Sequence, residues 1–149
     1  MTYPQPAVVS AIHDHFVPVQ INTQDDNNKK VIDTYRQAWT PDVRVLGHDG
    51  FDYDHWNGYL PPFEFLPRLL LGLGVAALRT GHFEGAGQVF ENLSRTFPTS
   101  FSAPEATYWQ AVSEYRATGE GRTLQTLWRK LQSRYPESIW RTKQSFIEQ

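Results

Sequence analysis

The sequence predicts a mixed fold, in which an α/β part is followed by an all-helical part. All eight Asp residues lie at or before Asp54, whereas all eight Glu residues lie at or after Glu64. Asp favours turns and caps and Glu favours helix interiors, so the boundary is expected near Pro61–Pro62. Short β-branched and aromatic runs precede this boundary, and helical periodicity dominates after it.

The first element is predicted to be a helix over residues 7–15, because apolar residues recur four positions apart at Val8 and Ile12. A strand is expected next, over residues 16–21, from its β-branched and aromatic content. Pro18 has no backbone N–H to donate to a ladder, so this strand is expected at the edge of a sheet.

A second helix and a β-hairpin follow. The helix is expected to begin between positions 23 and 26. Its apolar face comprises Val31, Ile32, Tyr35 and Ala38. Thr40–Pro41 interrupts the helical pattern, and residues 43–46 then have the composition of a strand. Asp49–Gly50 is a hairpin turn signal, so residues 51–53 are expected on the returning strand.

The helical part contains an internal repeat of 38 residues. Ala86, Phe90, Leu93 and Pro98 match Leu124, Trp128, Leu131 and Pro136 in turn. A period near this value is typical of helical-hairpin repeats. Gly74 and Ala86 are small enough for paired helices to approach closely, Gly81 suits the turn between them, and Pro98 ends the second helix.

The next helix is expected to begin with a capping box formed by Ser102 and Glu105. Its inner face comprises Tyr108, Ala111, Val112 and Tyr115. The preceding helix buries one stripe, formed by Phe83, Ala86, Phe90, Leu93 and Phe97. A final helix over residues 139–147 is expected to cap the stack.

Three groups of residues in the first part resemble the thioredoxin fold. Residues 16–19, with Asn22, are similar to the strand that follows the redox helix, and Trp39-Thr40-Pro41 is similar to the family's cis-proline loop. His48-Asp49-Gly50 and residues 58–66 are similar to its closing hairpin and last helix. The resemblance covers about residues 1–75 and implies an incomplete thioredoxin-like sheet.

The resemblance has gaps. Nothing corresponds to the family's first strand, first helix, second strand or CxxC motif, and the chain contains no cysteine. Residues 1–4 resemble the stretch just after that motif in bacterial thioredoxin-like proteins. Two explanations stay open. Either a CxxC lies upstream of Met1 in a longer redox protein, or the chain folds as written and completes its sheet differently, with a partner chain.

In the thioredoxin family, the backbone before the cis-proline pairs with an extended substrate, much as a strand adds to a sheet edge. The resemblance places this role on Thr40 and Pro41. Most X–Pro peptide bonds are trans, so a trans Pro41 that simply opens a strand is the alternative to the implied cis bond.

The helical part resembles the tetratricopeptide pattern. The matching residues are Leu73, Gly74, Gly81, Phe83, Ala86, Phe90 and Pro98. The resemblance implies TPR-like helical hairpins over residues 66–149, which share the 66–79 helix with the first part. A solenoid needs roughly three repeats to stand alone, so this shorter stack is expected to pack against the first part.

Composition and charge exclude several kinds of chemistry. A net charge of −2 and a pI of about 6.2 predict no basic face, so no nucleic-acid partner is expected. The absence of cysteine excludes disulfides, thiolate metal sites and cysteine nucleophiles. No cofactor is expected, and the chain as given is expected to be redox-inactive. The most apolar stretch, residues 69–78, is too short to cross a bilayer, so a cytoplasmic location without membrane contact is expected.

One hairpin gathers residues that could bind a metal, namely His48, Asp49, Asp52, Asp54 and His55. Alternation along a strand would place Asp52 and Asp54 on one face and His55 on the other. Because such ligands would not converge, no metal is expected.

The function predicted from these patterns is a protein or peptide interaction module. Its candidate binding residues are Trp39, Thr40, Pro41, Tyr108, Trp109 and Trp140, the last three on the surface of the helical hairpins. The alternative for these three is a place in the core. A homodimer is also expected, with residues 16–21 or 43–46 near the contact, because proteins cover exposed strand edges. The alternative function is that of a thioredoxin-family disulfide oxidoreductase with an upstream CxxC.

Overall fold

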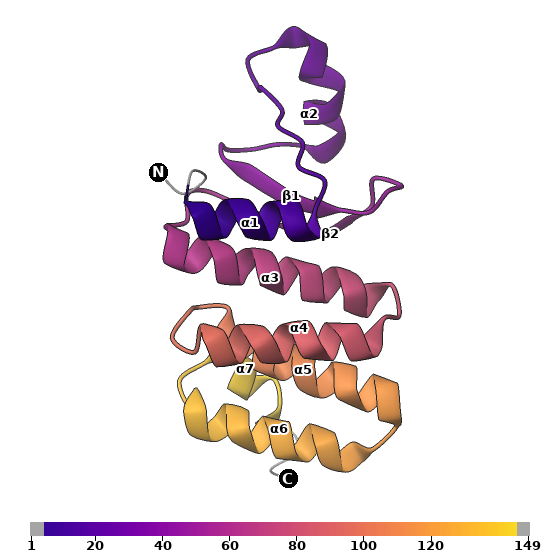
Figure 1. The fold of residues 1–149 in the computed structure, drawn as a ribbon, viewed down its shortest axis with the longest axis vertical. Helices are drawn as coiled ribbons and strands as arrows, with labels where there is room; N and C mark the ends of the chain where they lie inside the picture. Colours follow the sequence, from indigo (N-terminus) through magenta and orange to yellow (C-terminus); the bar gives the residue numbers. More distant parts are fainter. Residues whose placement is uncertain (1–4, 146–149) are drawn as a thin grey trace.

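The computed structural model describes residues 5–145, so residues 1–4 and Ile147 lie outside the described residues. Its elements are α1 (Pro6–His15), a short 3-10 helix (Asp26–Asn28), α2 (Lys29–Tyr35), β1 (Asp42–Leu46), β2 (Asp52–Asn57), α3 (Pro62–Arg79), α4 (Phe83–Thr96), α5 (Ala103–Thr118), α6 (Gly121–Arg134) and α7 (Ile139–Thr142). Figure 1 shows an elongated stack with α2 and the hairpin at one end and α6 at the other. This order confirms a small α/β part followed by an all-helical part.

Helix α3 joins the two parts of the chain. One side of α3 packs against α1 and the hairpin, and another packs against α4 (Figure 1). On the first side, Val8 of α1 is buried with Phe65 and Leu69 of α3. The expected helix over residues 7–15 is therefore confirmed, with its apolar stripe turned toward α3.

The strand expected over residues 16–21 is wrong. These residues follow α1 without regular secondary structure, and the side chains of Val17 and Val19 are 90% and 77% exposed. The sheet in the described part of the chain contains β1 and β2 alone, so the segment has no strand to pair with. Alternating β-branched residues favour a strand only where a neighbouring strand can complete the ladder.

The hairpin is confirmed, with two adjustments. Strands β1 and β2 pair antiparallel, and Gly50 takes the positive φ of +82° that the turn requires. The second strand begins at Asp52, one residue later than expected. Helix α2 ends earlier than expected, at Tyr35, because Arg36 adopts a left-handed conformation; Ala38 therefore lies outside the helix.

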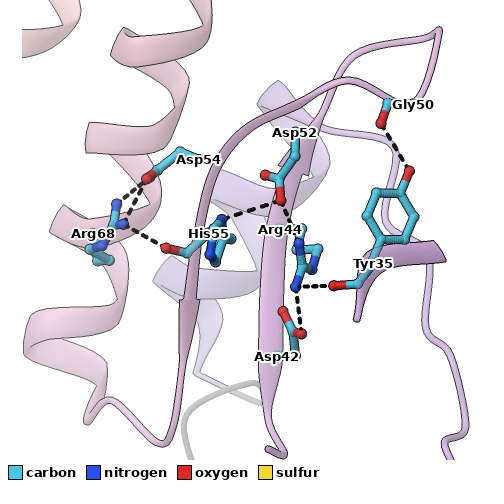
Figure 2. Close-up of polar contacts among 8 residues, drawn as sticks. All are labelled: Tyr35, Asp42, Arg44, Gly50, Asp52, Asp54, His55 and Arg68. Carbon is cyan, nitrogen blue, oxygen red and sulfur yellow. Dashed lines mark hydrogen bonds and ion pairs between the residues drawn. The ribbon is translucent and has the colours of Figure 1, made fainter. Parts of the chain in front are cut away.

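A bulge in β2 overturns the expected arrangement of its polar residues. Val45 pairs with Asp54 and Leu46 pairs with Asp52, so Tyr53 is the extra residue. An extra residue reverses the alternation of the side chains on either side of it. Asp52 and His55 consequently share the face away from α3, whereas Asp54 points to α3 (Figure 2).

The 38-residue repeat is visible in the backbone. Helix α6 begins and ends 38 residues after α4, and each is followed by a residue of nearly the same conformation, Phe97 and Tyr135. The turns before these helices contain Gly81 and Gly119, also 38 residues apart, with φ of +84° and +76°. Tyr135 donates a hydrogen bond from its Oη to the carbonyl of Pro98, at 2.9 Å, which ties the two repeats together.

The core of the stack lies between α3, α4 and α5. Phe90 of α4 is fully buried, and its ring lies directly against Gly74 of α3, so the close approach expected at Gly74 is confirmed. In the expected stripe on α4, Ala86, Phe90 and Leu93 are fully buried, whereas Phe83 and Phe97 are half-buried. On α5, Ala111 is buried and Tyr108 and Val112 are half-buried, but Tyr115 is 40% exposed.

Two expectations about helix ends are wrong. Ser102 makes no side-chain cap at the start of α5, and Glu105 instead accepts a hydrogen bond from Trp109. The final helix α7 spans four residues rather than nine. Its attachment comes from the buried Gln144, whose Nε2 donates to the Trp128 carbonyl at 2.7 Å. Among the described helices, none has the length and apolar character needed to cross a membrane.

Candidate functional site

The first group of expected site residues lies just before β1. The Thr40–Pro41 peptide bond is cis, as the thioredoxin resemblance implies. The Pro41 carbonyl accepts a hydrogen bond from the Gly58 N–H at 2.8 Å, which closes the open end of the hairpin. The side chain of Trp39 is 70% exposed, so this loop presents an indole ring to solvent.

The second group of expected site residues forms one aromatic cluster. The ring centroids of Tyr108 lie 5.2 Å from Trp109 and 5.2 Å from Trp140, and Trp109 and Trp140 lie 5.8 Å apart. Tyr108 also stacks on the buried Trp128 of α6, at 5.7 Å. All three expected residues are half-buried. The cluster therefore anchors α7 to α5, and its three rings remain partly exposed to solvent.

Opposite charges flank this aromatic cluster. The Lys143 ammonium lies 3.6 Å from the centre of the Trp140 ring, a cation–π contact. On the other side, the Glu105 carboxylate accepts a hydrogen bond from the Trp109 indole N–H at 3.1 Å. Both charged groups are thus held in place by the aromatic rings that the sequence singles out.

An ion pair beside the cluster joins the hairpin to α3. Arg68 donates through both Nη atoms to the Asp54 carboxylate, and its Nη2 also reaches the His55 carbonyl at 3.2 Å (Figure 2). The guanidinium lies over the Trp56 ring, 4.8 Å from its centre. The charges of Arg68 and Asp54 both act on Glu105, the carboxylate that is hydrogen-bonded to Trp109 of the aromatic cluster.

The pKa of Glu105 is raised from its ordinary value of 4.5, chiefly because burial disfavours the charged form. Asp54 raises this pKa further, whereas the Trp109 hydrogen bond and the charges of Arg68 and Lys143 lower it. A carboxyl group with a raised pKa holds its proton more tightly in the folded state than in the unfolded state. Its contribution to stability is therefore complete below the unfolded pKa and is lost as the pH rises through the folded pKa.

We expect Glu105→Gln to remove this loss while keeping an acceptor for the Trp109 indole. The difference in free energy of unfolding between Glu105→Gln and the parent chain should therefore grow in favour of the variant as the pH rises above about 4.5. Urea unfolding of both proteins between pH 4 and 8 measures it. Glu91→Gln, at an exposed position of α4, is the control for exchanging a carboxylate for an amide. A difference for Glu105→Gln that grows no more than the difference for Glu91→Gln would contradict the effect of burial on Glu105.

The outer face of the hairpin holds a separate polar network. Arg44 donates to Asp52 at 2.5 Å, to Asp42 at 2.9 Å and to the Tyr35 carbonyl at 2.9 Å (Figure 2). The hydrogen bond that Arg44 donates to the Asp42 carboxylate is the main cause of the raised pKa of Arg44. His55 joins the network through a 3.2 Å contact with Asp52. The carboxylates of Asp42 and Asp52 both accept hydrogen bonds from Arg44. Among the described residues, no group of metal-ligating side chains converges.

One set of exposed residues was not predicted to be part of a site. Phe63, Phe101 and Ile139 are 70%, 86% and 69% exposed, and they follow one another at intervals of 38 residues. Each lies within two residues of the start of a helix, α3, α5 or α7. The repeat that aligns the buried positions could have located these residues too, had it been extended from the core to the exposed positions.

Comparisons of the chain with family models, with curated proteins and with solved structures each find no match.

Proposed function

We propose that this chain is a redox-inactive, thioredoxin-like protein-interaction module whose TPR-like helical hairpins bind a short peptide. The proposal depends chiefly on one observation: Tyr108, Trp109 and Trp140 come from two helices, form one cluster and remain partly exposed. Aromatic rings contribute large contact areas at little cost in conformational entropy, which is why they dominate binding hot spots.

The charges around the cluster define the kind of peptide. An apolar or aromatic anchor would pack against the exposed faces of Trp109 and Trp140. Lys143 and Glu105, already fixed against these rings, would orient the peptide through a carboxylate at one end and an amide or cationic group at the other. Because the Arg68–Asp54 pair is internally satisfied, it supports the surface without needing a ligand.

Selection from a phage-displayed library of random twelve-residue peptides tests this proposal. We expect a shared motif with one apolar anchor and an acidic residue, and dissociation constants in the micromolar range. In NMR spectra, the indole N–H signals of Trp109 and Trp140 should shift when the selected peptide is added. The signal of Trp39, on a different surface, should not shift.

Two matched charge reversals sharpen the test. Lys143→Glu should lower the affinity for the selected peptide at least tenfold, whereas Lys130→Glu, on the exposed face of α6, should leave this affinity unchanged. An affinity that is unchanged by Lys143→Glu would contradict binding at α5 and α7. So would a peptide that shifts the indole N–H signal of Trp39 instead of those of Trp109 and Trp140. A shift of Trp39 alone would assign the site to Thr40 and Pro41, as the thioredoxin resemblance implies.

A second candidate function is disulfide exchange by a longer chain. The features that support it are the cis Thr40–Pro41 bond, the exposed Trp39 beside it and the hairpin that leads into α3. The chain itself has no cysteine to exchange. Reading the gene upstream of Met1 tests this candidate: an in-frame CxxC shortly before Met1 supports it, and a stop codon without such a motif removes it.

A further inference from the structure

Charge is distributed unevenly along this chain. Residues 1–120 contain eight Lys or Arg and fourteen Asp or Glu, whereas residues 121–145 contain six Lys or Arg and a single Glu. The second group forms α6 and α7, and α6 lies at one end of the elongated stack (Figure 1). The net charge of −2 therefore conceals an acidic body and a basic end.

The cations on the outer side of α6 form a row. We define the cation row as Arg122, Arg129 and Lys130, all of which are exposed. At 3.6 residues per turn, they lie on the side of the helix opposite Trp128 and Leu131, which are buried in the stack. Helix α6 contains no Asp or Glu, and no ion pair joins the row to another of the described residues.

The 38-residue repeat shows that the charge of the row is not required by the architecture. Arg122 and Arg129 stand 38 residues after Glu84 and Glu91, which occupy equivalent and likewise exposed positions of α4. A solvated helix face accepts either sign of charge at these positions. The stability of the helical hairpin therefore does not explain a row of cations without an acidic neighbour on α6.

We propose that the cation row of α6 binds an acidic segment of a partner protein. Charge complementarity defines the partner, because a chain that carries carboxylates is attracted to all three cations at once. Arg122 and Arg129 lie two helical turns apart, about 10 Å along the axis. A polyproline II chain advances about 9 Å in three residues and returns to the same face, so acidic residues at every third position match this spacing.

Two features favour a peptide segment over a bilayer or a nucleic-acid duplex. A helix that binds a membrane surface inserts its apolar face, but the apolar face of α6 is buried against α5 and α7. Carboxylates also border the row, since Glu84, Glu91 and Glu114 line one hollow together with Thr123 at the start of α6. A broad anionic surface would meet these carboxylates, whereas a single chain can follow the row alone.

This inference is independent of the proposed peptide site, because the row lies on the opposite side of α6 from Trp128, on which Tyr108 of the aromatic cluster stacks. The probe is a fluorescein-labelled peptide with Glu at every third position and Ser elsewhere, so it offers no apolar anchor to the aromatic cluster. The control peptide carries Gln in place of Glu. Fluorescence anisotropy with the full chain should give a dissociation constant of about 10–100 μM for the Glu peptide at low ionic strength, steep weakening with added salt, and no binding of the Gln peptide.

Two matched double variants locate the binding. Arg122→Glu with Arg129→Glu should lower the affinity for the Glu peptide about tenfold or more. Lys29→Glu with Lys30→Glu, at exposed positions of α2, changes the net charge equally and should leave this affinity within about twofold. All four residues are exposed, so both variants should keep the helical circular dichroism of the parent. Arg122→Lys with Arg129→Lys retains the charges and should retain the affinity.

Three results would overturn the inference. Equal losses of affinity in the two charge-reversed variants would mean that the peptide responds to net charge and not to the row. Shifts of the indole N–H signals of Trp109 and Trp140, in place of the backbone amides of α6, would assign the Glu peptide to the aromatic cluster. Tighter binding of phosphatidylserine vesicles or of a DNA duplex, lost in the Arg122→Glu with Arg129→Glu variant, would assign the row to a broad polyanion.

Discussion

Replacing Phe90 with alanine is expected to lower the free energy of unfolding by about 3–5 kcal/mol. The side chain is fully buried, and it belongs to the core cluster that joins α3, α4 and α5. Truncation removes the ring from the apolar interior and leaves a cavity, which rigid helix backbones on either side cannot fill. For a domain stabilised by about 5–15 kcal/mol in total, this loss is a large fraction. Urea unfolding followed by circular dichroism measures it.

Gly74 provides the matched partner for a double-mutant cycle. A Cβ at this position would lie 2.4 Å from Cε1 of Phe90, so Gly74→Ala is expected to cost about 1–3 kcal/mol through overpacking. In the Phe90→Ala background the added methyl enters the cavity, so the same change should be neutral or stabilising. Gly85→Ala, at an open and exposed helical position, controls for helix propensity and should stabilise by about 0.5–1 kcal/mol. Equal effects at positions 74 and 85 would contradict the packing argument.

Sequence periodicity predicted the part of the fold that depends on local pattern. The 38-residue repeat located α4 and α6, and it placed Phe90 and Leu131 in the core. Gly81 and Asp49–Gly50 marked turns whose backbone conformation demands such residues. The sequence also singled out Tyr108, Trp109 and Trp140, which the fold brings into contact with one another.

The features that were missed depend on what surrounds a residue rather than on its own type. Residues 16–21 have strand composition, but pairing requires a neighbouring strand. The bulge at Tyr53 moves Asp54 to the α3 side of the hairpin, and no residue type in β2 predicts a bulge there. Glu105 has the spacing of a capping residue, yet its carboxylate accepts a hydrogen bond from the Trp109 indole N–H, one helical turn away, and not from the Ser102 N–H.

The second large effect is expected at Arg68. Arg68→Met keeps the aliphatic stem over Trp56 but removes the guanidinium, so the Asp54 carboxylate is left unpaired between β2 and α3. The two side chains are 20% and 18% exposed, so we expect a loss of about 2–4 kcal/mol, slightly below the cost of breaking a fully buried pair. Arg95→Met, on the surface of α4, should change the free energy of unfolding by less than about 0.5 kcal/mol.

The double variant Asp54→Asn with Arg68→Met should recover more than half of this loss, because it removes the unpaired charge as well as its partner. Amide hydrogen exchange locates the effect. The hairpin meets the helical stack mainly through α3, so its amides should exchange faster in Arg68→Met while those of α4 and α6 keep their protection. Equal loss of protection in α4 and α6 would mean that the hairpin and the helices unfold as one unit. In that case Asp54 and Arg68 would stabilise the whole chain rather than the attachment of its α/β part.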